Sequence, residues 1–207
     1  MYTVIGAARS RAIRVYWALE EMGLEYQANT APPRSNEAMK HNPSGKVPCL
    51  LVEGETLLDS VAIIQYLADK HDKLTFAAGT IARAQQDSFT QFCCDEIDSI
   101  LWTATKHTFV LPEKYRVPAI IETAQYEFAR AMKTLEARLG DKEFIMGDQL
   151  SIPDIILGHC GTWADVAHFE VPKGPLTAYF SRLAARPAFV KSRQLSNARP
   201  SLVPKET

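Results

Sequence analysis

The chain has 207 residues, 46% of them hydrophobic and 23% charged, an ordinary composition for a folded protein with one large or two small domains. Its 23 Lys and Arg residues are balanced by 24 Asp and Glu residues, so the net charge of -1 gives no electrostatic reason to expect nucleic acid or membrane partners. The N-terminus does not have the pattern of a secretory signal, and no stretch reaches about 18 uninterrupted apolar residues, so we expect a cytoplasmic protein.

The first third of the chain alternates between strand and helix patterns. Residues 3–7 and 24–29 are predicted strands, and the amphipathic segment 11–23 between them is a predicted helix that ends at Gly23, which makes a βαβ unit. The further elements predicted here are a short helix at 36–40, strands at 48–52 and 55–58 joined by a turn at Gly54, and a helix at 60–70.

From about residue 80 the strand signals stop and the apolar residues follow a helical period. The predicted helices are 83–107, 119–139, 152–166, 176–185 and 188–194. Strands and helices followed by helices alone indicate the α+β fold class, with an α+β domain at 1–72 beside an all-α domain at 80–200.

The four cysteines, Cys49, Cys93, Cys94 and Cys160, show neither a CxxC pattern nor a paired spacing with histidine. This spacing predicts neither a zinc site nor a disulfide framework. We therefore expect reduced, buried thiols and no metal.

Three motifs stand in order along the chain: NPSGKVPCL at 42–50, LLDSVAIIQYLADKH at 57–71 and FIMGDQLSIPDIIL at 144–157. With these motifs the sequence resembles the cytosolic glutathione S-transferases. The resemblance implies a thioredoxin-like N-terminal domain (βαβ-α-ββα) and a helical C-terminal domain, in agreement with the division reached from periodicity. It also implies that the first two motifs bind glutathione and that the third caps a helix, with Ser151 and Asp154 forming a capping box.

By resemblance, Val47 precedes a cis-Pro48 and offers its backbone to the cysteinyl part of glutathione as an added strand would. Asp59 is then a partner for the ligand's ammonium group, and Ser60 for its γ-glutamyl carboxylate at a helix start. The other glutathione-binding candidates are Lys46 and His41, for the glycyl carboxylate.

Each of these residues also has a plain structural interpretation. Pro48 can simply start a strand, and Ser60 can simply cap a helix. Lys46 and His41 can be solvated surface charges.

In this family the nucleophile is the thiol of glutathione, whose pKa the protein lowers from about 8.5 by donating a hydrogen bond from the start of the first helix. Ser10 is the one hydroxyl there and is the catalytic candidate. The alternatives are the charge of Arg9 or Arg11, a backbone amide, and Ser10 acting only as a helix cap. Tyr2 stands at the start of the strand, which disfavours a tyrosine-type enzyme.

The resemblance implies that a second substrate binds near the end of the first long helix of the second domain, where Trp102, Phe109 and Tyr115 are candidates. Aromatic residues at such spacing also occur in protein cores, and we assign Trp163 and Phe169 to the core.

The function implied is the addition of the glutathione thiolate to a small hydrophobic electrophile in detoxification, by a homodimer that uses glutathione as cosubstrate and no metal. One alternative is a noncatalytic or regulatory binding protein with the same fold. A glutathione-dependent isomerase is the other.

Overall fold

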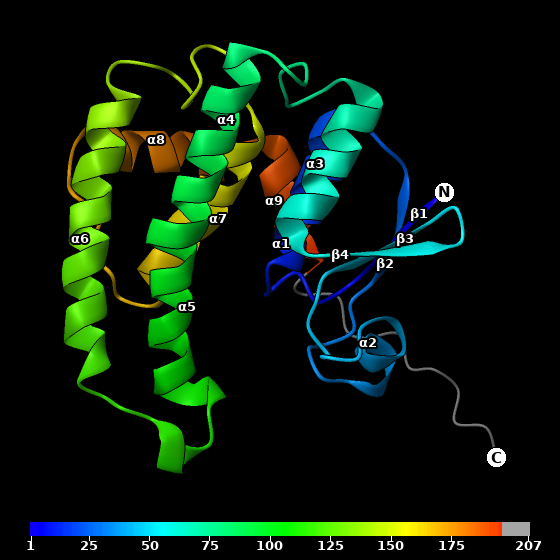
Figure 1. Cartoon of the computed structure of the whole chain (residues 1–207), viewed down its shortest axis with the longest axis horizontal. Helices are drawn as coiled ribbons and strands as arrows, with labels where there is room; N and C mark the ends of the chain where they lie inside the picture. The colour runs from blue at the N-terminus through cyan, green and yellow to red at the C-terminus, as the bar shows by residue number, and fades with distance from the viewer. Residues whose placement is uncertain (196–207) are drawn as a thin grey trace. The chain divides into compact units, whose positions relative to one another are not determined.

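The computed structural model describes residues 1–195, which fold into two compact units (Figure 1). The first unit is Met1–His71 together with the described residues from Arg186 onward, and the second is Asp72–Ala185. This division differs at its end from the helical domain expected at 80–200, because the last helix of the chain contacts the first.

The first unit contains a four-stranded sheet in the order β2-β1-β3-β4, in which β1 and β2 are parallel and the other pairs antiparallel. Its strands are β1 (Tyr2–Ile5), β2 (Tyr26–Asn29), β3 (Cys49–Val52) and β4 (Glu55–Leu58). The register places Ile5 beside Cys49, and Cys49 beside Leu58. The end of β1, the start of β3 and the end of β4 therefore lie at the same edge of the sheet.

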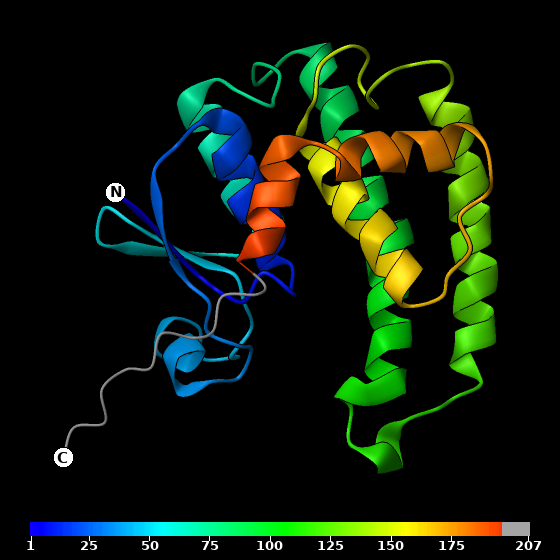
Figure 2. The ribbon, with the colours of Figure 1, turned by 180° about the vertical axis from the view of Figure 1, so that it is seen from behind.

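The helices of this unit are α1 (Ala12–Met22), α2 (Asn36–His41), α3 (Ser60–His71) and α9 (Pro187–Gln194). Helix α1 packs against both α3 and α9, and Figure 2 shows α9 alongside α1. The rings of Trp17 and Phe189 lie 4.7 Å apart, and Arg186 donates to both carboxylate oxygens of Glu21 at 2.6 and 2.8 Å. An aromatic contact and a bidentate ion pair thus attach α9 to α1.

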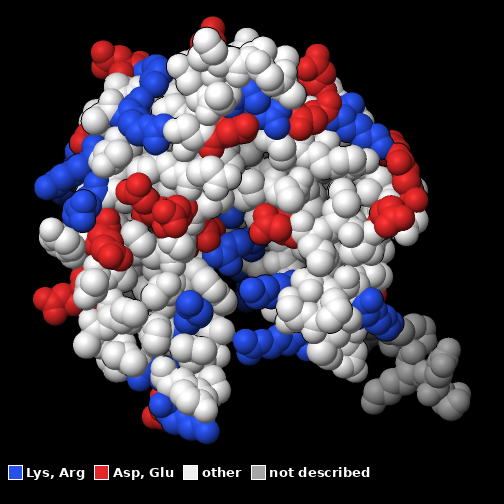
Figure 3. Space-filling view, viewed as in Figure 1, with Lys and Arg blue, Asp and Glu red and all other residues white. Residues whose placement is uncertain are grey.

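The second unit consists of helices only. They are α4 (Ile81–Phe92), the π-helical η1 (Cys93–Asp98), α5 (Ser99–Thr105), the π-helical η2 (Lys106–Val110), the 3-10 helix η3 (Glu113–Tyr115), α6 (Ile120–Leu139), α7 (Ile152–Val166) and α8 (Pro175–Ala184). The helix predicted at 83–107 is thus a longer helical run with two π-helical segments. Acidic and basic side chains lie intermixed over the upper part of the face seen in Figure 3, and Lys and Arg outnumber Asp and Glu in its lower part.

The capping motif surrounds one buried carboxylate, that of Asp154. Asp154 accepts hydrogen bonds from the Ser151 amide (2.8 Å) and hydroxyl (2.7 Å), from the Ile145 amide (2.8 Å) and from the Tyr179 hydroxyl (2.6 Å). The predicted capping box is confirmed, with proline in the first turn of α7. Burial raises the pKa of Asp154, so its hydrogen bonds are needed to offset the cost of desolvation.

The thioredoxin-like N-terminal unit and the helical unit confirm the predicted fold class. No disulfide joins the four cysteines, and Cys49, Cys93 and Cys160 are buried as expected, whereas Cys94 is half-buried. Among residues 1–195, no helix combines the length and the apolar character needed to cross a membrane.

Candidate functional site

Two loops of the first unit meet closely where the sheet ends. A Cβ added at Gly6, which follows β1 with φ 147°, would lie 2.9 Å from the Cβ of Ala12 and 3.0 Å from that of Val47. Glycine is required here because both the positive φ and the close approach exclude a side chain. Gly6 was not among the predicted site residues; a glycine near the end of a predicted strand was the available signal.

The loop before β3 presents unpaired backbone. The Val47–Pro48 bond is cis, as the resemblance implied. Neither the N–H nor the C=O of Val47 has a backbone partner within residues 1–195. The neighbouring backbone is held in place, because Asn42 donates to the carbonyl of Lys46 (3.0 Å) and Arg34 donates its amide to the carbonyl of Gly45 (2.8 Å). Val47 can therefore pair with an extended ligand as an edge strand does.

Asp59 lies at the end of β4 and is exposed, with a left-handed φ of 70°. Its Oδ1 accepts the amides of Val61 (2.8 Å) and Ala62 (3.3 Å), so Asp59 caps α3. Its second oxygen, Oδ2, accepts no hydrogen bond from any residue in the described part of the chain. One carboxylate oxygen thus holds the helix, and the other is available to a cationic group.

Ser60 is buried, only 2% exposed, and its Oγ accepts a hydrogen bond from Nη1 of Arg14 at 3.4 Å. The interpretation of Ser60 as a simple helix cap is wrong, because Asp59 has that role. Arg14 is 1% exposed, and sequence reasoning missed it. The available signal was an arginine on a helix whose other residues are mostly apolar.

Ser10 lies in the turn that leads into α1. Its hydroxyl donates to the carbonyl of Ala7 (2.7 Å) and accepts the amide of Ala12 (3.2 Å). The amides of Ala8 and Arg9 have no acceptor within residues 1–195. The turn thus offers two backbone donors, together with one hydroxyl that must leave the Ala7 carbonyl before it can donate to a ligand.

Models of known families match both parts of the chain. "Glutathione S-transferase, N-terminal domain" matches residues 9–70, and "Glutathione S-transferase, C-terminal domain" matches residues 118–189. The chain belongs to the glutathione S-transferase family.

Curated relatives extend this glutathione S-transferase similarity over most of the sequence. Glutathione transferase GST 23 of Zea mays is 28% identical over 193 residues, covering 86% of this chain and 82% of the maize protein. Glutathione S-transferase U19 of Arabidopsis thaliana is also 28% identical, covering 87% of this chain and 83% of its own length.

Solved structures agree with the fold of this glutathione S-transferase. The glutathione transferase URE2P6 from Phanerochaete chrysosporium, solved in complex with oxidized glutathione, is 27% identical with a TM-score of 0.77, covering 95% of this chain and 96% of that one. A glutathione transferase from Methylococcus capsulatus str. Bath, at 24% identity, has a TM-score of 0.83 with 95% and 99% coverage, which supports the fold.

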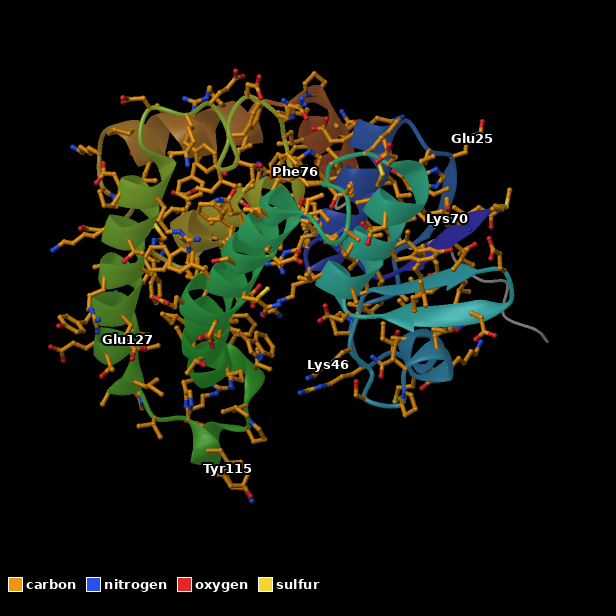
Figure 4. The ribbon with its side chains drawn as sticks, turned by 45° about the horizontal axis from the view of Figure 1, so that its top comes forward. Glu25, Lys46, Lys70, Phe76, Tyr115 and Glu127 are labelled. Carbon is orange, nitrogen blue, oxygen red and sulfur yellow. The ribbon has the colours of Figure 1, made fainter. Side chains whose placement is uncertain are left out.

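The two cationic candidates of this glutathione S-transferase differ in their surroundings. His41 lies at the end of α2 with Nε2 3.5 Å from Oε1 of Glu37, and only 22% of its side chain is exposed. Lys46 is exposed, projects away from the sheet (Figure 4) and has no acidic partner in the described part of the chain. Lys46 is therefore the better placed cation for a carboxylate from solution.

The aromatic candidates lie on the helical unit. Trp102 in α5 is half-buried, with its ring 6.5 Å from that of Trp163, whose Nε1 donates to Thr105 at 3.1 Å. Phe109 is 66% exposed and Tyr115 59% exposed, and Tyr115 lies at the tip of the segment between α5 and α6 (Figure 4).

Two aromatic residues assigned to the core have different outcomes. Phe169 is buried against Phe128, with ring centroids 5.3 Å apart, as predicted. Trp163 is half-buried, so its assignment to the core is only partly right.

Proposed function

We propose that this glutathione S-transferase binds glutathione along the edge formed by the β1–α1 turn, Val47 and Asp59, and adds the glutathione thiolate to a small hydrophobic electrophile. The observation that carries this proposal is the unpaired backbone of Val47 in the loop that leads into β3. The neighbouring strand β4 is followed by Asp59, whose Oδ2 is open. Glutathione is an extended peptide with backbone groups to pair, an ammonium and a carboxylate at its γ-glutamyl end and a second carboxylate at its glycyl end, and such a ligand needs this combination.

Glutathione binding in this proposal uses separate groups for each part of the tripeptide. The backbone of Val47, ahead of Pro48, pairs with the cysteinyl residue, and Oδ2 of Asp59 accepts from the γ-glutamyl ammonium. The γ-glutamyl carboxylate lies at Ser60, at the start of α3, where the helix dipole favours an anion. Lys46 pairs with the glycyl carboxylate, and His41 is a second cation beside it.

Catalysis in this proposal is the formation and placement of a thiolate. Ser10 turns its hydroxyl from the carbonyl of Ala7 to the sulfur, and the thiol proton leaves to solvent. The amides of Ala8 and Arg9 are the alternative donors, and the charges of Arg9 and Arg11 favour the anion. The thiolate attacks the electrophilic carbon, a C–S bond forms, and the leaving group departs as an anion.

Trp102 is the first candidate for apolar contact with the electrophile, and Phe109 and Tyr115 are the further candidates. Glutathione is the cosubstrate, and no step of this reaction uses a metal. The proposal also includes a homodimer, a cytoplasmic location and a role in detoxification. We propose no nucleic acid or membrane partner, because the net charge of the chain is near zero.

A noncatalytic glutathione-binding protein is the second candidate. The hydrogen bond from the Ser10 hydroxyl to the Ala7 carbonyl favours it, because a hydroxyl held in that way does not donate to sulfur. The isomerase alternative has no observation of its own in its favour.

Two measurements on the full chain test the proposal. Calorimetry with glutathione measures binding, and the absorbance of the dinitrophenyl conjugate formed from glutathione and a dinitrophenyl halide measures turnover. Binding with turnover supports a transferase, and binding without turnover against a panel of halides and enones supports the noncatalytic alternative. Absence of glutathione binding contradicts both.

A further inference from the structure

Three metal-ligating side chains meet inside the helical unit, outside the glutathione site. Asp98 is the last residue of η1, and His159 and Cys160 are neighbours in α7. A carboxylate oxygen, an imidazole nitrogen and the thiol sulfur of these residues all lie within 4.8 Å of one another. The residues are 7%, 9% and 1% exposed, so the cluster belongs to the interior and not to a solvated acidic surface.

The donor types and distances suit a tetrahedral divalent ion. Bonds of about 2.3 Å to sulfur and about 2.0 Å to nitrogen and oxygen put the donor atoms of a zinc site about 3.3–3.6 Å apart. The donor atoms of the three residues lie within 4.8 Å of one another, so each pair needs to approach by about 1 Å or a little more to reach that spacing. Rotation of the side chains can produce this movement.

Charge balance favours a metal at this place. A thiolate from Cys160, a carboxylate from Asp98 and a neutral imidazole from His159 carry two negative charges in total, and a divalent cation cancels them. A buried group of charges is tolerated when its members are paired or bind a metal. The metal-bound cluster would therefore be neutral in the interior.

We propose that Asp98, His159 and Cys160 bind a divalent cation of the zinc class, with the fourth position open to water or a small ligand. The ion joins η1 to α7 across the interior of the helical unit. The segment that carries Asp98 is π-helical, a form that occurs often at functional sites. Sequence spacing does not reveal this cluster, because Asp98 lies far from the His159–Cys160 pair along the chain.

Cobalt provides the test, because a cobalt–thiolate bond has a charge-transfer band in the near ultraviolet that a carboxylate or imidazole alone does not produce. The reduced full-length protein is stripped with a chelator and titrated with Co²⁺ and then Zn²⁺ in the absence of glutathione, whose own thiol binds metals. We expect the band to appear with one equivalent of Co²⁺ and to disappear when Zn²⁺ displaces it. Zinc should also raise the Tm.

Variants identify the ligands. Cys160→Ser should abolish the band, and Asp98→Asn and His159→Gln should each weaken binding by more than the 10- to 100-fold typical of losing an outer partner. Cys93→Ser removes another buried thiol of the same unit and is the matched control, which should keep the band.

The proposal is overturned if the wild-type protein gives no band and no zinc-dependent rise in Tm, which would make the cluster a metal-free part of the core. A band that survives in Cys160→Ser, or is lost in Cys93→Ser, also overturns it. The wild-type titration decides the matter even if a variant does not fold. None of these results bears on glutathione binding by the first unit.

Discussion

Asp59 has two roles in the proposed site, because Oδ1 caps the start of α3 while Oδ2 accepts no hydrogen bond from the described residues and is open to the ligand's ammonium group. Asparagine separates the two roles. It is also a good helix cap and tolerates a left-handed φ, but it carries no charge.

We predict that Asp59→Asn keeps the Tm close to that of the wild type and weakens glutathione binding by about 10-fold to 100-fold, the effect of losing one charged hydrogen bond. Calorimetry measures the affinity for glutathione, and thermal unfolding measures the Tm. Asp59→Ala is the comparison, and it should lower the Tm as well because the cap is lost. An unchanged affinity in Asp59→Asn would remove Asp59 from the site.

The Ser10 hydroxyl is predicted to donate to the thiolate and not to the neutral thiol. Ser10→Ala should then raise the pKa of bound glutathione and slow turnover near neutral pH by about 10-fold to 100-fold, with little change in affinity. The defect should shrink as pH rises, because above the thiol pKa the thiolate forms without help. Thiolate absorbance titrated in both proteins measures this. Superimposable curves would assign activation to the amides of Ala8 and Arg9, or to Arg9 and Arg11.

At the scale of elements, α7 is held by the buried carboxylate of Asp154, to which Ser151 donates twice. We predict that Ser151→Ala lowers the free energy of unfolding by about 0.5–2 kcal/mol through loss of the hydroxyl contact. Urea unfolding measures it. Ser181→Ala in α8 is the control, since Ser181 is exposed, and its unfolding curve should match that of the wild type.

Helix α9 attaches to α1 through Phe189, which is 1% exposed and lies against Trp17. Truncation of a buried phenylalanine leaves a cavity, so Phe189→Ala should cost about 3–5 kcal/mol of unfolding free energy. Faster amide hydrogen exchange in α1 should accompany the loss. Val190→Ala, a partly exposed neighbour in the same helix, is the control. Unchanged exchange in α1 would mean that α9 contributes little to its stability.

Much of the element order could be predicted because its signals are local. Glycine at 23 ended α1 where expected, β4 was predicted residue for residue, and the capping box fixed the start of α7. The features that the sequence did not predict depend on contacts between residues far apart in the chain. The return of α9 to α1, the hydrogen bond of Arg14 to Ser60 and the meeting of Asp98 with His159 join residues far apart in the chain.

The features of the candidate site that depend on local sequence could also be predicted, and those that depend on side-chain orientation could not. The motif at 42–50 indicated Val47 and the cis-Pro48, and Asp59 is exposed, as a residue that contacts a ligand needs to be. Sequence could not reveal that Asp59 caps α3, or that the Ser10 hydroxyl donates to Ala7, because both depend on side-chain orientation. The two π-helical segments were also not predicted, because the spacing of apolar residues in the sequence does not indicate a local change in the backbone hydrogen bonding of a helix.

At the scale of the whole molecule, we predict a homodimer formed by the exposed surfaces of α3 and α4, the assembly that the family resemblance implies. Sedimentation velocity at micromolar concentration should give about twice the mass of the 23.1 kDa chain. A replacement by a charge at Ile81, which is 80% exposed on α4, should shift the equilibrium toward monomer if that surface is used. A single monomeric species in the wild type would contradict the prediction.

The attachment of α9 to α1 has a consequence for how the protein is made. The sheet and the first three helices leave the ribosome early. The contacts of Trp17 with Phe189 and of Glu21 with Arg186 form only after the whole helical unit has been synthesised. Until then one side of α1 is uncovered, and the ring of Trp17 and the carboxylate of Glu21 can contact other molecules. A nascent chain stalled before residue 186 should be more sensitive to protease in α1 than the released protein, and chaperones that recognise exposed aromatic surface would find it there.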